Sequence, residues 1–179
     1  EGADELFGGY TYYKDIVDAD FLHRELRRSI TSLHNINLQR VDRMTMAHAI
    51  EGRVPFLDLS MIRLGQLIPP EMKIVGSPPI EKWILRKAFE DLLPTEITWR
   101  EKEQFDEGSG TVEMLEGVLT GVMGKTEMQN YCCRFSETQL RSAEECHYHR
   151  LFMEVFEQPG LMLANVARWA ERPAWNTAE

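Results

Sequence analysis

The chain has 179 residues, enough for one domain with a sizeable core, and its 43% hydrophobic and 27% charged content is ordinary for a globular protein. A net charge of −9 argues against nucleic acid as a partner, because it repels phosphate backbones, and no apolar run reaches the length of a membrane span. Three cysteines, two of them adjacent, favour a reducing, cytoplasmic setting over a disulfide framework.

The chain opens on a cluster of carboxylates. Three acidic side chains lie within residues 1–5, and Gly2 among them lets the backbone approach a ligand closely. Gly8-Gly9 is expected to end a short helix that begins at Asp4, and the apolar pair before it to anchor the segment in a core. Such a cluster suits Mg²⁺, a hard cation that prefers oxygen ligands. An acidic helix cap, stabilised by the helix dipole, is the alternative interpretation.

Four more helices are predicted before residue 99, because apolar side chains recur there at helical spacing. Gly52 is expected to end the second, Asp58 to cap the third and Ser77-Pro78-Pro79 to open the fourth. Residues 99–110 show no clear period and are predicted to form a loop. The four helices cover residues 21–33, 38–50, 59–68 and 80–92.

The rest of the chain is predicted to be helical too. Thr111 is expected to cap a helix whose apolar face reaches Val122. Residues 136–139 resemble a capping box that opens a helix to about Phe156, and Pro159-Gly160 separates it from a last short helix over residues 161–169. Since no segment has the pattern of a strand, we predict a mainly α fold.

Two sets of side chains are interpreted as structural. Tyr10, Tyr12 and Tyr13 are expected to form a bridge between core and surface. The cysteines are expected to be partly buried thiols rather than zinc ligands, because two adjacent cysteines cannot easily bind one metal and no C-x-x-C spacing is present.

Three motifs follow one another in the order of a known family. They are EGADELFGGY at residues 1–10, EGRVPFLD at 51–58 and KEQFDEG at 102–108. These runs resemble GEGADELFGGY, EARVPFLD and KEQFSDG in the synthetase domain of glutamine-hydrolysing asparagine synthetase. NLQRVDRMTM at residues 37–46 and EKWILRKAFE at 81–90 extend the resemblance over residues 1–110. The sequence departs from the family pattern at Gly52, where alanine is usual, and at Asp106-Glu107, where Ser-Asp is usual.

The resemblance implies the C-terminal part of a synthetase domain with a PP-loop ATP pyrophosphatase-like α/β fold, whose sheet lies upstream. Residues 1–110 would carry the motifs and residues 111–179 a helical tail. The implied reaction is ATP-dependent conversion of aspartate to asparagine through β-aspartyl-AMP, with ammonia from an upstream glutaminase domain. ATP and Mg²⁺ are the implied cofactors, and a homodimer is compatible with the family. The fragment alone is expected to be inactive.

The resemblance also implies roles for charged residues near the phosphates. Glu1 matches a glutamate involved in adenylate formation. Asp4 matches a residue that helps to hold Mg²⁺ on the triphosphate, and Gly2 is a further cofactor-binding position. Lys102 matches a lysine that stabilises charge as pyrophosphate leaves. The alternatives are an acidic helix cap for the carboxylates and a solvated loop position for the lysine.

The middle motif contributes two further candidates. Glu51, as a catalytic residue, and Arg53, as a substrate-binding residue, match a segment that lines the site in the family. A buried ion pair that fixes a helix end is the alternative interpretation.

Two other functions remain open from the sequence. One is a related adenylating enzyme that makes a different amide or a lactam ring. The other is a non-catalytic helical interaction module that has kept the motifs as scaffold.

Overall fold

The computed structural model describes residues 1–103 and 109–163, and the chain divides into two compact units. The described residues of the first are Glu1–Arg100, and those of the second begin at Glu101. Within these described ranges the regular elements are all helices, and one isolated antiparallel bridge joins Val75 to Ile80. The prediction of a mainly α fold is confirmed for this part of the chain. No helix in it is both long and apolar enough to cross a membrane.

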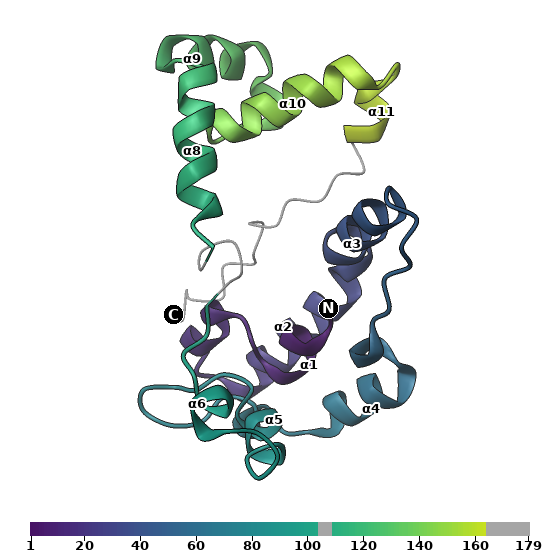
Figure 1. Cartoon of the computed structure of the whole chain (residues 1–179), viewed down its shortest axis with the longest axis vertical. Coiled ribbons are helices and arrows are strands. Elements are labelled where there is room, and N and C mark those ends of the chain that lie inside the picture. The colour runs from purple at the N-terminus through teal and green to yellow at the C-terminus, as the bar shows by residue number, and fades with distance from the viewer. Residues whose placement is uncertain (104–108, 164–179) are drawn as a thin grey trace. The chain divides into compact units, whose positions relative to one another are not determined.

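In the first unit, the short helix α1 lies against α2, α4 and α5 (Figure 1). The α-helices are α1 (Ala3–Phe7), α2 (Ala19–Ser32), α3 (Asn37–Met46), α4 (Leu59–Leu67), α5 (Trp83–Ala88) and α6 (Thr95–Thr98). Short 3₁₀ helices join them: η1 (Thr11–Asp15), η2 (Leu33–Asn35), η3 (Pro55–Leu57) and η4 (Pro70–Met72).

The core of this unit forms where α1 and α2 meet. Leu6 and Phe7 of α1 are buried, as expected from the opening motif, and Gly8 ends the helix in the left-handed conformation at φ 73°. Tyr13 and Leu26 are fully buried too, in a hydrophobic cluster with Ile16 and Leu22. The predicted helix over residues 21–33 is confirmed as α2.

The helix predicted over residues 38–50 is shorter than expected. α3 ends at Met46, and Ala49 adopts the left-handed conformation at φ 57°. The amide of Ile50 donates to the carbonyl of Thr45, and that of Ala49 to Met46, so a Schellman motif closes the helix. The prediction that Gly52 ends it is therefore wrong, because alanine occupies the position where glycine would be expected.

The predicted cap at Asp58 is confirmed, whereas the predicted helix over residues 80–92 is wrong. The Asp58 carboxylate accepts from the Ser60 amide at 2.8 Å and caps α4, which holds the pKa of Asp58 below its ordinary value. The apolar stripe over residues 80–92 does not form one helix, because Ile80 pairs in both directions with Val75. Helix α5 begins only at Trp83 and ends at Ala88.

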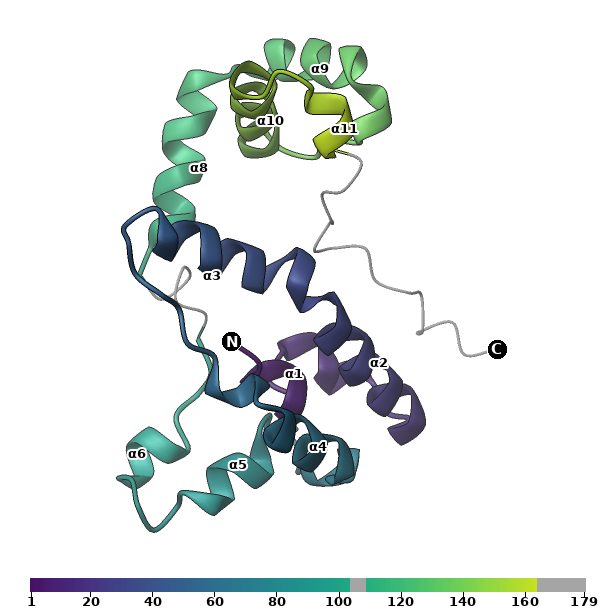
Figure 2. The same cartoon turned by 90° about the vertical axis from the view of Figure 1, so that its right-hand side faces the viewer.

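In the second unit, α10 packs against α8 and α9 (Figure 2). Its helices are α8 (Thr111–Val122), α9 (Lys125–Arg134), the 3₁₀ helix η5 (Ser136–Thr138), α10 (Ala143–Val155) and α11 (Pro159–Leu163). Gly110, not Thr111, precedes α8 as its cap residue. Pro159 and Gly160 belong to α11, whereas residues 164–169 of the predicted last helix lie outside the described residues.

The capping box predicted at residues 136–139 is also wrong, since that segment forms η5. Helix α10 begins only at Ala143, and Ser142 is its cap. The Ser142 hydroxyl accepts from the Glu145 amide at 3.1 Å, and the Glu145 carboxylate accepts from the Arg141 amide at 2.7 Å. A Ser-x-x-Glu pair thus does open the helix, but further along the chain.

Candidate active site

The carboxylate of Glu1 is held by two side chains of α3. Asn37 Nδ2 donates to Glu1 Oε2 at 3.0 Å, and Arg40 donates to Glu1 Oε1 at 3.1 Å. The Glu1 side chain is 19% exposed, so its carboxylate is fixed but not sealed from solvent. Gly2 is the cap residue of α1 and has no side-chain cap bond. The acidic-cap interpretation is therefore wrong for Glu1, whose carboxylate bonds to α3.

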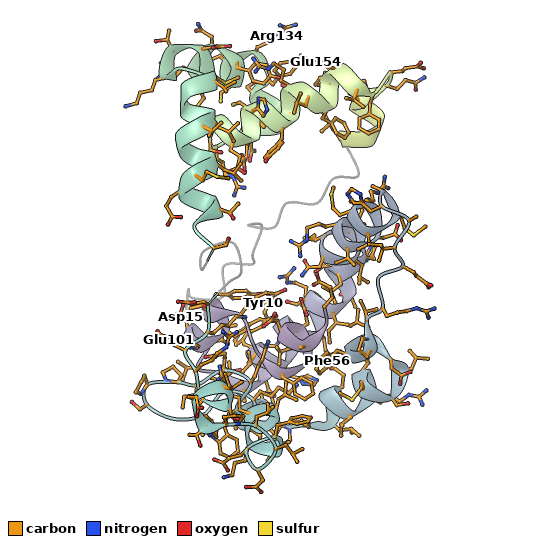
Figure 3. The ribbon with its side chains drawn as sticks, viewed as in Figure 1. Tyr10, Asp15, Phe56, Glu101, Arg134 and Glu154 are labelled. Carbon is orange, nitrogen blue, oxygen red and sulfur yellow. The ribbon has the colours of Figure 1, made fainter. Side chains whose placement is uncertain are left out.

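Behind this contact, a chain of hydrogen bonds runs into the core. Asn37 Nδ2 also donates to the Tyr10 hydroxyl at 3.1 Å, and that hydroxyl donates to the buried carboxylate of Glu5. Burial raises the pKa of Glu5, and burial together with Glu5 raises the pKa of Tyr10. Tyr10 therefore keeps its proton near neutral pH. Figure 3 labels Tyr10, which stacks on Tyr12 with ring centroids 5.8 Å apart.

Asp4 faces a cation in the structure. Its Oδ1 lies 2.8 Å from Lys82 Nζ, and both side chains are partly exposed. Gly9 leaves room for this pair, because a Cβ at that position would lie 2.0 Å from Asp4 Oδ1 and 2.2 Å from Lys82 Cε. Lys82 has φ 53° and immediately precedes α5. An exposed carboxylate with a lysine beside it provides oxygen for a metal and positive charge for a phosphate.

Gly2 brings the first two motifs together. It has φ 93°, and a Cβ there would lie 2.5 Å from Leu57 Cδ2 and 3.2 Å from Phe56 Cβ. Phe56, which is labelled in Figure 3, also packs edge-on against Phe7, with ring centroids 6.1 Å apart. The close approach at Gly2 is therefore to η3, where there is no room for a Cβ.

A buried ion network fixes the segment that leads to the third motif. Glu81 is 3% exposed and pairs with Lys14 at 2.6 Å and with Arg86. Burial would raise the pKa of Glu81, but these cations outweigh it and the pKa lies below its ordinary value. Arg86 also donates to the carbonyls of Thr98 at 2.7 Å and Arg100 at 2.9 Å. The end of the first unit is thereby tied to α5.

Glu51 and Arg53 form an ion pair with each other at 2.9 Å, and their side chains are 68% and 81% exposed. The buried-pair interpretation is wrong, and an exposed pair contributes little stability. Among the described residues, no hydrogen bond or ion pair joins either of them to Glu1.

Lys102 belongs to the second unit and lies in non-helical backbone, half-buried. The loop prediction agrees with residues 99–103 and 109–110, while residues 104–108, including the Asp106-Glu107 departure, lie outside the described residues.

Comparison with known proteins identifies the family of the chain. The sequence model of the asparagine synthase family matches residues 14–173. The chain belongs to the asparagine synthase family. It is 35% identical to asparagine synthetase B (glutamine-hydrolyzing) of Escherichia coli (strain K12) over 161 residues, which are 89% of this chain and 29% of that protein.

A probable asparagine synthetase (glutamine-hydrolyzing) of Dictyostelium discoideum is 33% identical over 193 residues, covering 100% of this chain and 34% of that protein. The asparagine synthetase (glutamine-hydrolyzing) of Triphysaria versicolor is 45% identical over 116 residues, which are 62% of this chain and 20% of that protein. This asparagine synthase chain thus spans about a third or less of the curated relatives that it matches.

Five contacts of the candidate site were not predicted from the sequence. Asn37 and Arg40 hold Glu1, Lys82 faces Asp4, and Tyr10 links Asn37 to Glu5. The available signal was their position inside residues 1–10, 37–46 and 81–90, the stretches that carry the family resemblance.

Proposed function

We propose that this chain is the C-terminal part of the synthetase domain of a glutamine-hydrolysing asparagine synthetase. In the complete enzyme, meaning the synthetase with its upstream part, it serves the ATP-dependent conversion of aspartate to asparagine. The observation that carries the proposal is the Glu1 carboxylate, held by Asn37 and Arg40 yet open to solvent. That remaining exposure leaves the carboxylate accessible to a small molecule such as ammonia.

Amide formation needs an activated carboxylate, because the negative charge of aspartate repels a nucleophile. Adenylation by ATP gives β-aspartyl-AMP and pyrophosphate, and ammonia then displaces AMP. As ammonia attacks, its nitrogen becomes positively charged and must lose a proton. The proposed role of Glu1 is to steer the ammonia and to accept that proton, which its bonds to Asn37 and Arg40 keep it oriented to do.

The residues around Asp4 fit ATP and Mg²⁺ in their donor chemistry. Asp4 is an oxygen ligand whose side chain is 30% exposed, and Lys82 provides a cation beside it. Mg²⁺ supplies charge neutralisation on the triphosphate when it is bound. Because Lys82 Nζ lies on Oδ1 of Asp4, it would have to share the carboxylate with the metal or turn toward a phosphate oxygen.

Three further roles rest on the family resemblance. Lys102 stabilises charge on the departing pyrophosphate, for which a flexible lysine on a loop is suited. Glu51 acts as a catalytic residue and Arg53 as a substrate-binding residue. Their exposure leaves them available for contacts that this chain alone does not make.

The proposal is tested by replacing Glu1 with glutamine in the complete enzyme, with ammonia supplied directly. Glu1→Gln keeps the shape of the side chain but cannot accept the proton, so we expect kcat for asparagine formation to fall by about 100-fold or more. The matched control is Glu71→Gln, which alters an exposed carboxylate on η4 and should leave kcat unchanged. Equal kcat in both variants would contradict the proposal. Failure to form asparagine from aspartate, with turnover of another carboxylate, would favour the related adenylating enzymes.

A further inference from the structure

We propose that Asn37 and Tyr10 are positioning residues that fix the Glu1 carboxylate for catalysis. The inference rests on the proposed function of Glu1 and goes beyond it by assigning the side chains through which the protein orients that carboxylate. Both residues act through Glu1: Asn37 contacts it directly, and Tyr10 contacts Asn37.

The direction of each hydrogen bond in this chain is determined. The hydroxyl hydrogen of Tyr10 is donated to Glu5, so the Tyr10 oxygen must accept from Asn37. The Glu1 carboxylate also accepts, and Asn37 Nδ2 has one hydrogen for each of these two partners. A flipped amide would place Oδ1 against a carboxylate and a hydroxyl oxygen. The amide therefore has one orientation, and it holds Glu1 Oε2 in one place.

The amide of Asn37 is retained at a cost to the fold. Asn37 is 6% exposed, and its Oδ1 has no hydrogen-bond partner among residues 1–103 and 109–163. A buried acceptor without a partner destabilises a protein, whereas an apolar side chain of similar shape would not. That cost is accounted for if the hydrogen bond to Glu1 serves catalysis.

A neighbouring tyrosine provides the contrast. The Tyr12 hydroxyl donates to Glu25 at 2.9 Å, and Glu25 is paired with Arg28. This second tyrosine–glutamate pair matches the first in residue types. Its carboxylate belongs to α2 and bonds to Arg28, whereas Glu1 bonds to Asn37 and Arg40 of α3. Tyr12→Phe is thus a matched control for Tyr10→Phe.

The test measures kcat, the Michaelis constants for ATP and aspartate, and the melting temperature of the complete enzyme in three variants. Tyr10→Phe releases the Asn37 amide from one acceptor, and we expect kcat to fall about 10-fold. Asn37→Asp keeps the shape but replaces both donors with a like charge, and we expect a fall of about 100-fold. Both variants should leave the Michaelis constants within about twofold of wild type. Tyr12→Phe should lower the melting temperature as much as Tyr10→Phe and leave kcat unchanged.

A structural role alone would give a different pattern. If Tyr10→Phe and Tyr12→Phe lower the melting temperature alike and neither lowers kcat, the inference is overturned, even if Asn37→Asp does not fold. Glu1→Gln, measured alongside, distinguishes a failure of the positioning role from a failure of the role proposed for Glu1. If Glu1→Gln loses activity and Tyr10→Phe does not, only the positioning role fails. If Glu1→Gln retains full activity, the proposed role of Glu1 fails and the positioning role fails with it.

Discussion

Lys73 shows how a single buried charge is accommodated in the first unit. The residue is fully buried, and its ammonium donates to the carbonyl of Gly65 at 2.7 Å, near the C-terminal end of α4. A cation is favourable at that end of a helix, where carbonyls lack partners within the helix. Burial nevertheless lowers the pKa of Lys73 from 10.5 to about 8.

This pKa makes stability depend on pH in a defined window. Between about pH 8 and pH 10.5 the unfolded chain binds a proton at Lys73 that the folded chain does not. Stability from this residue should therefore rise with pH across that window, and level off below it. We expect the urea midpoint of the wild type to rise relative to that of Lys73→Met, which lacks the titrating group. Parallel pH curves for the two proteins would show that Lys73 titrates normally in the folded chain.

The roles of single residues in the opening motif could be predicted in part from the sequence, but the residues that they contact could not. The sequence placed Leu6 and Phe7 in a core, and both are buried. It interpreted Gly2 as room for a ligand, whereas the structure shows contact with η3. The Glu1–Asn37 bond joins residues 36 positions apart, and neither residue lies in a local pattern that reveals such a contact.

At the scale of elements, glycine has opposite effects on the stability of two helices. Gly65 lies in α4, and a Cβ there would lie 2.8 Å from Leu6 Cδ2 and 3.2 Å from Leu6 Cβ. Leu6 is fully buried and cannot move aside freely. Gly117 lies in α8, and a Cβ there would have no atom within 4 Å. One glycine is required by packing and the other only weakens its helix.

Alanine at each position should separate these two situations. Gly65→Ala should destabilise the chain by about 1–3 kcal/mol, because overpacking against Leu6 outweighs the gain in helix propensity. Gly117→Ala should stabilise its unit by about 0.5–1 kcal/mol, since nothing opposes that gain. The check is urea unfolding followed by circular dichroism. A shift of the same sign in both variants would mean that the α1–α4 contact is looser than described.

Helix positions were predictable where a polar cap lies next to the apolar pattern. Asp58 before α4 is the clearest case, since its carboxylate caps the helix as expected. The extent of α3 was not predictable, because Ala49 adopts a conformation that favours glycine. The pairing of Ile80 with Val75 likewise overrode an apolar stripe that suggested a longer α5. Tertiary contacts decided these boundaries rather than local propensity.

At the scale of the whole molecule, the charged candidates are divided between the two units. Glu1 and Asp4 lie in the first, and Lys102 in the second. Residues 1–10 and 51–58 both lie in the first unit, where Phe7 contacts Phe56, a contact that was not predicted from the sequence. The role of Lys102 stays a prediction from the family pattern, because most of its motif lies outside the described residues.

Lys102 allows the most direct test that this chain supplies charge to an adenylating reaction. The measurement is steady-state release of pyrophosphate by the complete enzyme carrying Lys102→Ala, with ammonia supplied directly. If Lys102 stabilises charge only in the transition state, kcat should fall by about 100-fold or more while the Michaelis constants for ATP and aspartate change much less. Lys102→Arg should restore little, because a planar guanidinium does not replace a compact ammonium. Turnover near the wild-type rate in Lys102→Ala would contradict the account and leave Lys102 an ordinary loop lysine.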